Sequence, residues 1–71
     1  MKEAQKKEAF EAVAKDRSKW NKYFDCDGNR YIYSSHLNYL YRLDKDRLTL
    51  VGSFFWAGWE YCKFFYIGES E

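Results

Sequence analysis

The sequence lacks the residues on which most small catalytic and metal sites are built. It has no proline and one histidine, His36, in 71 residues, and its two cysteines, Cys26 and Cys62, form no C-x-x-C motif. A tetrahedral zinc site needs more ligands than these. The phosphate-binding patterns G-x-x-x-x-G-K and G-x-G-x-x-G do not occur. We therefore expect a non-enzymatic protein with no cofactor and no bound metal.

The chain also lacks a long apolar segment and an excess of charge of one sign. Its longest uncharged run, Leu48–Trp59, has 12 residues, well short of the ~20 that span a bilayer. The N-terminal segment MKEAQKKEAF contains no apolar stretch of the kind found in a signal peptide, so we expect a cytoplasmic protein with reduced cysteines. A net charge of +1 excludes a strongly basic nucleic-acid binder and an acidic DNA mimic.

Aromatic residues, by contrast, are abundant. Seven Tyr, six Phe and three Trp make up 23% of the chain. A domain of this size buries roughly 60% of its unfolded surface, and each aromatic side chain offers about 150–250 Å². One small core cannot hide them all, so some rings must be exposed or lie in an interface.

The N-terminal segment predicts a single helix. Ala, Glu, Lys and Gln dominate residues 1–24, and neither glycine nor proline interrupts them. Phe10, Val13, Trp20 and Phe24 fall on one stripe at helical spacing. This stripe is the surface that we expect to pack on the rest of the domain.

The remaining residues predict antiparallel strands. Tyr39–Val51 has two runs rich in strand-forming residues on either side of Asp44-Lys45-Asp46, a pattern typical of a β-hairpin. A bulge is expected at Gly52, and a last strand from Trp59 to Ile67. The alternative for residues 53–67 is a buried helix, which their glycines and many aromatic residues disfavour.

The predicted fold class is therefore α+β, a long N-terminal helix packed on a three- or four-stranded antiparallel β-meander. We expect a single domain over residues 1–71. Its predicted parts are a helix at 1–24, a turn at 25–29, antiparallel strands at 30–67 and a tail at 68–71.

One motif, between Phe24 and Leu37, resembles the calcium loop of the EF-hand family. Asp25, Asp27 and Asn29 match the first three side-chain ligand positions of that loop. Arg30 stands where the family has glycine, and His36 stands where it has the closing glutamate. The resemblance implies a degenerate calcium loop, which we keep as one alternative function.

A second alternative is the binding of single-stranded nucleic acid. Aromatic rings that stack on bases, interleaved with cations that contact phosphates, are typical of such proteins. The residues with this pattern are Lys15, Arg17, Lys19, Trp20, Lys22 and Tyr23 near the helix end, and Tyr31, Tyr33, Tyr39 and Tyr41 in the strands. The competing interpretation is that these rings pack between helix and sheet.

The main functional hypothesis rests on the C-terminal aromatic residues. A sheet has two faces, one helix covers only one of them, and alternation places rings on both faces of the last strand. Tyr, Trp and Phe are enriched at the centres of protein interfaces. The predicted anchors are Trp56, Trp59, Tyr61, Phe64 and Tyr66, with Lys15, Arg17 and Lys19 as charges around them.

From these features we expect a small protein-binding module that acts through an aromatic sheet face or edge. Its partner would be another protein or a second copy of the chain, in a homodimer. Compact chains of this type are common among phage and mobile-element proteins that inhibit or adapt a host protein. Nucleic acid is the less favoured partner, and no membrane association is expected.

Overall fold

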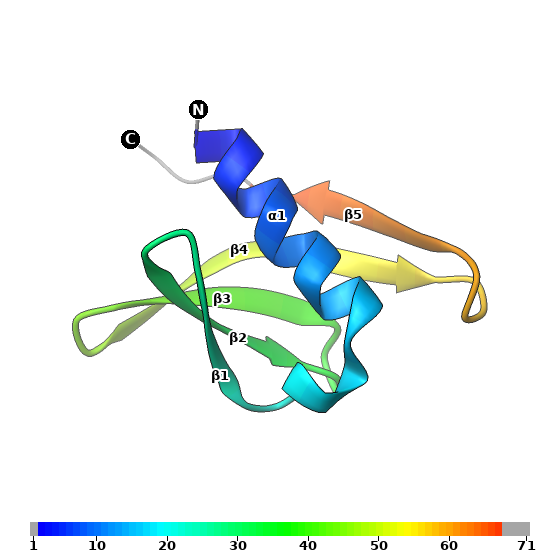
Figure 1. Cartoon of the computed structure of the whole chain (residues 1–71), viewed down its shortest axis with the longest axis horizontal. Coiled ribbons are helices and arrows are strands. Elements are labelled where there is room, and N and C mark those ends of the chain that lie inside the picture. The colour runs from blue at the N-terminus through cyan, green and yellow to red at the C-terminus, as the bar shows by residue number, and fades with distance from the viewer. Residues whose placement is uncertain (1, 68–71) are drawn as a thin grey trace.

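An N-terminal helix lies across one face of a five-stranded antiparallel sheet in the computed structural model, which describes residues 2–67 (Figure 1). Each strand pairs with the next one in sequence, so the sheet is a simple meander. The predicted α+β class and antiparallel sheet are confirmed, but the sheet has five strands. The elements are α1 (Lys2–Lys15), the 3-10 helix η1 (Arg17–Lys19), β1 (Tyr23–Cys26), β2 (Asn29–Ser34), β3 (Tyr39–Asp44), β4 (Arg47–Trp56) and β5 (Cys62–Tyr66).

The helix ends at Lys15, so the prediction of one helix over residues 1–24 is wrong beyond that point. Asp16 has an extended backbone (φ −140°), and its carboxylate accepts hydrogen bonds from the backbone N–H of Ser18 at 3.0 Å and from the Ser18 hydroxyl at 2.6 Å. Such side-chain bonds to the local backbone compete with helix continuation. The chain then turns at Asn21 (φ 62°) and enters β1, the strand that sequence reasoning missed.

The turn predicted at residues 25–29 is shorter than expected, because only Asp27 and Gly28 lie between β1 and β2. Both have positive φ, 53° and 82°, which is the geometry of a type I′ hairpin turn. Asp25 faces Arg30 across this hairpin, at 2.9 Å from its Nε. The segment that resembles an EF-hand loop is therefore a β-hairpin, and the helix–loop–helix arrangement of that family is not present here.

The predicted hairpin over Tyr39–Val51 is confirmed as β3 and β4. The register shifts beside Leu40, which pairs with Gly52 while Tyr41 pairs with Leu50. The extra residue of this bulge is Val51, one position before the site predicted. Residues 53–67 contain the end of β4 and the whole of β5, which excludes the alternative of a buried helix, although β5 begins at Cys62, three residues later than predicted.

The core lies between α1 and the sheet face beneath it. Ala9, Phe10 and Val13 of the helix are fully buried. The ring of Phe10 lies 4.9 Å from that of Phe54, centroid to centroid. Phe24 belongs to this core and Trp20 packs against it, although both lie outside the helix. Both residues are apolar for that reason, and both therefore fall on the apolar stripe in the sequence. The core also contains Tyr31, Tyr33, Leu40 and Val51.

No helix within residues 2–67 has the length and apolar character needed to cross a membrane.

Candidate functional site

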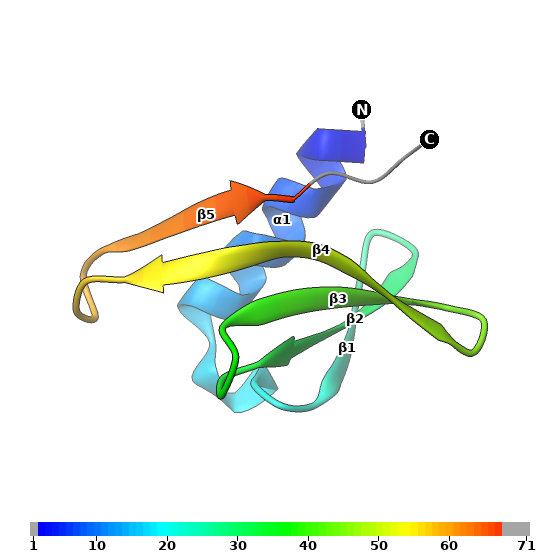
Figure 2. The same ribbon diagram turned by 180° about the vertical axis from the view of Figure 1, so that it is seen from behind.

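The two faces of the sheet differ in what covers them. Seen from behind, the sheet lies in front of α1, so one face has the helix on it and the other has no element across it (Figure 2). Paired residues on neighbouring strands project to the same side. Phe54 pairs with Phe64 and is buried under the helix, so Phe64 lies on the helix side. The side away from the helix is called the outer face below.

The outer face is largely apolar. One row of paired residues crosses four strands from Tyr23 through Ile32 and Tyr41 to Leu50, and a second row runs from Tyr39 through Ser53 to Phe65. Phe55 follows Ser53 by two positions on the same side, and Phe55 and Phe65 are 55% and 48% exposed. We define the outer face by its large apolar members, Tyr23, Ile32, Tyr39, Tyr41, Leu43, Leu48, Leu50, Phe55 and Phe65.

The predicted anchors divide between different places. Phe64 and Tyr66 are half-buried under the helix, where their rings lie 4.9 and 5.0 Å from the ring of Phe10. They pack against the core and do not lie on the uncovered face. Tyr61 is exposed in the loop before β5. Alternation could have identified Phe55 and Phe65 instead, had the buried side of β4 been known.

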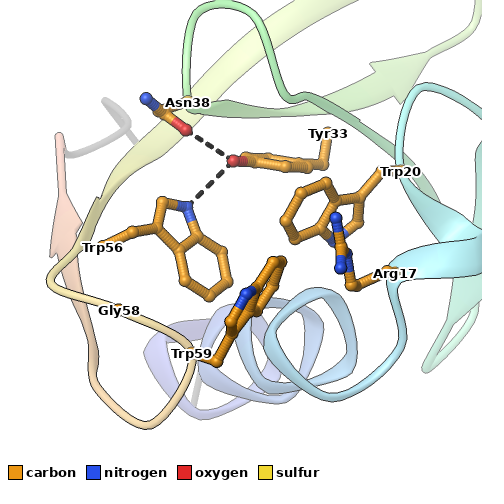
Figure 3. A pocket seen from close by; sticks show the side chains of 7 residues that line it. All are labelled: Arg17, Trp20, Tyr33, Asn38, Trp56, Gly58 and Trp59. Atoms are coloured by element: carbon orange, nitrogen blue, oxygen red, sulfur yellow. Dashed lines mark hydrogen bonds between the residues drawn. The ribbon is translucent and has the colours of Figure 1, made fainter.

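Trp56 and Trp59 come together in a pocket at the end of the helix layer (Figure 3). All three tryptophans of the chain line it, and the cavity has a volume of about 350 Å³. They reach it from separate segments: Trp56 from the end of β4, Trp59 from the loop before β5, and Trp20 from just after η1. We call this the tryptophan pocket, lined by Arg17, Trp20, Tyr33, Asn38, Trp56, Gly58 and Trp59.

Ring contacts and one cation form the walls of this pocket. The Trp20 ring lies 5.3 Å from that of Trp56 and 6.1 Å from that of Trp59, centroid to centroid. The guanidinium carbon of Arg17 lies 3.8 Å from the Trp59 ring centroid and 5.4 Å from that of Trp20. A cation held over an indole face is attracted by the ring quadrupole, so Arg17 helps to hold Trp59 in place.

A chain of hydrogen bonds fixes the floor of the pocket (Figure 3). The Trp56 Nε1–H donates to the Tyr33 hydroxyl at 3.0 Å, and this hydroxyl donates to Asn38 Oδ1 at 2.7 Å. Burial is the main cause that raises the pKa of Tyr33, so the phenol keeps its proton for Asn38. Asn38 is itself held by its backbone, whose carbonyl accepts from the N–H of Phe54 at 2.9 Å.

The structure also places the three predicted basic residues in different surroundings. Arg17 is part of the pocket, whereas Lys19 forms an ion pair with Asp16 at 2.9 Å. Lys15 is exposed at the last residue of α1. Sequence reasoning named Arg17, Trp56 and Trp59, which the structure brings together in this pocket. It did not place Tyr33 and Asn38 with them, because residues 33–38 are distant in sequence from residues 17–20 and 56–59.

Comparison of the chain with protein-family models, curated proteins and solved structures found no match. Within residues 2–67, no three His, Cys, Asp or Glu side chains are grouped so as to hold a metal ion. Function is therefore inferred from the two aromatic surfaces themselves.

Proposed function

We propose that this protein is a small non-enzymatic protein-binding module and that its outer face is the binding surface. The observation that carries the proposal is the uncovered, largely apolar side of the sheet, on which Phe55 and Phe65 are about half exposed. Contiguous apolar surface of this kind on a small domain marks an interaction site more often than a solvated one. Aromatic side chains in such a position provide most of the binding energy of an interface.

The charges around the outer face favour a protein partner over a nucleic acid. Lys63 is exposed on this face, whereas Arg30 is already paired with Asp25. Lys15 and Arg17 belong to the helix side of the domain. Binding to a nucleic-acid strand depends on several cations that neutralise phosphates, and the outer face does not collect them. Its apolar rings match an apolar protein surface better.

The size of the face also suits a protein interface. The molecule measures 33 × 21 × 20 Å along its principal axes, and an interface of standard size takes about 800 Å² from each partner. One broad side of this domain is comparable to that area. A partner that covers the sheet would therefore use nearly the whole outer face.

The proposal is tested by removing the two most exposed rings. We expect the double variant Phe55→Ser/Phe65→Ser to remain folded, because neither side chain contributes to the core. We also expect it to lose binding, measured as concentration-dependent self-association in sedimentation or as capture of a specific partner protein. Leu37→Ser is the matched control, since Leu37 is exposed to a similar degree in the loop between β2 and β3.

Two results would contradict the proposal. One is a wild-type protein that stays monomeric and captures no protein at all. The other is a partner that binds the double variant as tightly as it binds the Leu37→Ser control. Sedimentation also decides whether the partner is a second copy, because a homodimer forms without any other protein present.

A further inference from the structure

The tryptophan pocket is a second site, separate from the outer face. Tyr33 and Trp56 project to the helix side of the sheet, opposite to Phe55 and Phe65. Trp59 is 62% exposed, so a large part of one indole surface at this pocket is accessible to a ligand. A cavity of about 350 Å³ is large enough for one ring-bearing residue and part of its backbone.

The hydrogen-bonding groups of the pocket are mainly donors. The Tyr33 hydroxyl and Asn38 Oδ1 already accept, from Trp56 and Tyr33 respectively. The Trp59 Nε1–H and the Asn38 Nδ2 amide have no acceptor within residues 2–67, and the Arg17 guanidinium contacts only rings there. A guanidinium has five N–H donors and no acceptor. The pocket therefore suits a ligand with acceptors and few donors.

Proline in an extended peptide has that character. Its nitrogen carries no hydrogen, and in the polyproline II conformation the backbone carbonyls make no internal hydrogen bonds. Aromatic-lined grooves bind proline-rich segments by packing the flat ring on the aromatic walls while side-chain donors reach the carbonyls. The 71 residues contain no proline, so this part of the chain does not supply such a segment itself.

The charge of the pocket specifies the ligand further. Arg17 is its one charged lining residue, and its guanidinium makes no ion pair within residues 2–67. Lys15 and Lys22 are exposed on either side of it in sequence. We propose that the tryptophan pocket binds a proline residue of an extended peptide, with an acidic residue beside that proline facing Arg17.

Two other ligands fit less well. A quaternary ammonium group favours aromatic cages, but here Arg17 places a positive charge on the Trp59 ring and no carboxylate lines the pocket. A nucleobase stacks on indole rings, but its donors would find few acceptors that are not already used. These ligands serve as comparisons in the test.

The experiment uses the tryptophans as their own reporters. Because all three line the pocket, intrinsic fluorescence responds to this site. The probe is a short capped peptide of proline pairs separated by glutamates, and the matched peptide has alanine at each proline. We expect saturable quenching with the first peptide and affinity at least about tenfold weaker with the second. Oligothymidylate and trimethyllysine are titrated in parallel.

Variants assign the binding to named residues. Trp59→Ala should weaken the affinity for the proline peptide about thirtyfold, as truncation of a central interface tryptophan does. The variant keeps two tryptophans as reporters. Arg17→Gln should remove the preference for glutamate over glutamine in the peptide and reduce the salt dependence. Leu37→Ser and Phe55→Ser/Phe65→Ser should bind the peptide like wild type, which separates this site from the outer face.

The proposal is overturned if the alanine peptide binds as tightly as the proline peptide. It is also overturned if oligothymidylate or trimethyllysine binds more tightly than the proline peptide, or if no ligand changes the fluorescence. Far-UV circular dichroism of Trp59→Ala shows whether a loss of binding reflects the pocket or unfolding. If that variant unfolds, the glutamate preference measured with Arg17→Gln decides the matter.

Discussion

The ring of Phe10 occupies the space next to Gly52 into which any larger side chain would project. A Cβ built on Gly52 lies 2.5 Å from Cζ of Phe10 and also meets the backbone of Phe65. Real Cβ atoms do not approach other heavy atoms this closely, so glycine at this position allows the helix to lie against the sheet. The bulge at Val51 comes directly before this contact. The close packing of α1 on the sheet therefore depends on the glycine that directly follows the bulge in β4.

Gly52→Ala should therefore destabilise the fold. Overpacking a full core costs about 1–3 kcal/mol, and one of the obstructing atoms belongs to backbone, which cannot rotate away. The free energy of unfolding in urea measures the loss. Ser53→Ala on the outer face is the matched control and should change it by less than about 0.5 kcal/mol.

A second substitution shows whether Phe10 is the obstruction. Phe10→Leu alone should destabilise, but it should recover part of the loss when combined with Gly52→Ala, because the smaller side chain makes room. Strictly additive losses in this double-mutant cycle would mean that the two residues do not compete for the same space.

The β1–β2 turn should be sensitive at Gly28 and tolerant at Asp27. Both residues have positive φ, and a left-handed conformation costs about 1–2 kcal/mol in a residue with a Cβ. Gly28→Ala should lower the free energy of unfolding by that amount although the position is sterically open. Asp27→Asn should have little effect, since Asn adopts this conformation readily. Equal effects of the two substitutions would contradict the assigned turn.

Removing the Tyr33 hydroxyl should weaken the floor of the tryptophan pocket. Tyr33→Phe leaves the indole N–H of Trp56 without an acceptor and Asn38 Oδ1 without a donor. An unsatisfied, partly buried polar group costs about 1–3 kcal/mol. Thermal unfolding and near-ultraviolet circular dichroism measure the effect. Asn38→Ala in the Tyr33→Phe background should then lose only its backbone cost, since Asn38 has a left-handed backbone (φ 61°) that alanine adopts less readily. The hydrogen-bond part of its effect should be absent there, because one network joins the two residues.

The sequence predicted those elements whose signals are local. The β3–β4 hairpin follows from alternation on either side of a short polar break, and each part of that signal lies within Tyr39–Val51. The helix was predicted too long because Trp20 and Phe24 continue its apolar stripe. The hydrogen bonds of Asp16 to Ser18 and the left-handed backbone of Asn21 end the helix instead. The spacing of apolar residues in the sequence reveals neither of these two features.

The sequence predicted only some residues of the candidate site, and the reason is related. Aromatic rings occupy consecutive positions at Phe54–Trp56 and again at Phe64–Tyr66, so alternation alone does not say which side of a strand is covered. The structure decides this through the position of α1, whose Phe10 takes Phe64 and Tyr66 into the core. The pocket combines three separate segments of the chain, residues 17–20, 33–38 and 56–59, and no spacing in the sequence connects the three.

The hydrogen bonds that end the helix should make stability depend on pH in the acid range. The Ser18 hydroxyl first, then Lys19 and the Ser18 backbone, lower the pKa of Asp16 from 3.8 to about 2. The folded state thus favours the ionised carboxylate. Its contribution to stability is fully present above the unfolded pKa, near 4, and is lost as the pH falls through the folded value near 2.

Asp16→Asn should therefore lower stability at neutral pH and flatten the decline between pH 4 and 2. Chemical denaturation at several pH values, at low and at high salt, gives both quantities. Asp46→Asn is the control, because this exposed carboxylate lies in the β3–β4 loop and makes no hydrogen bond within residues 2–67. Part of the decline persists in any variant, because Arg30 likewise lowers the pKa of Asp25. If Asp16→Asn and Asp46→Asn have the same acid profile, the Asp16 bonds do not stabilise the helix end in solution.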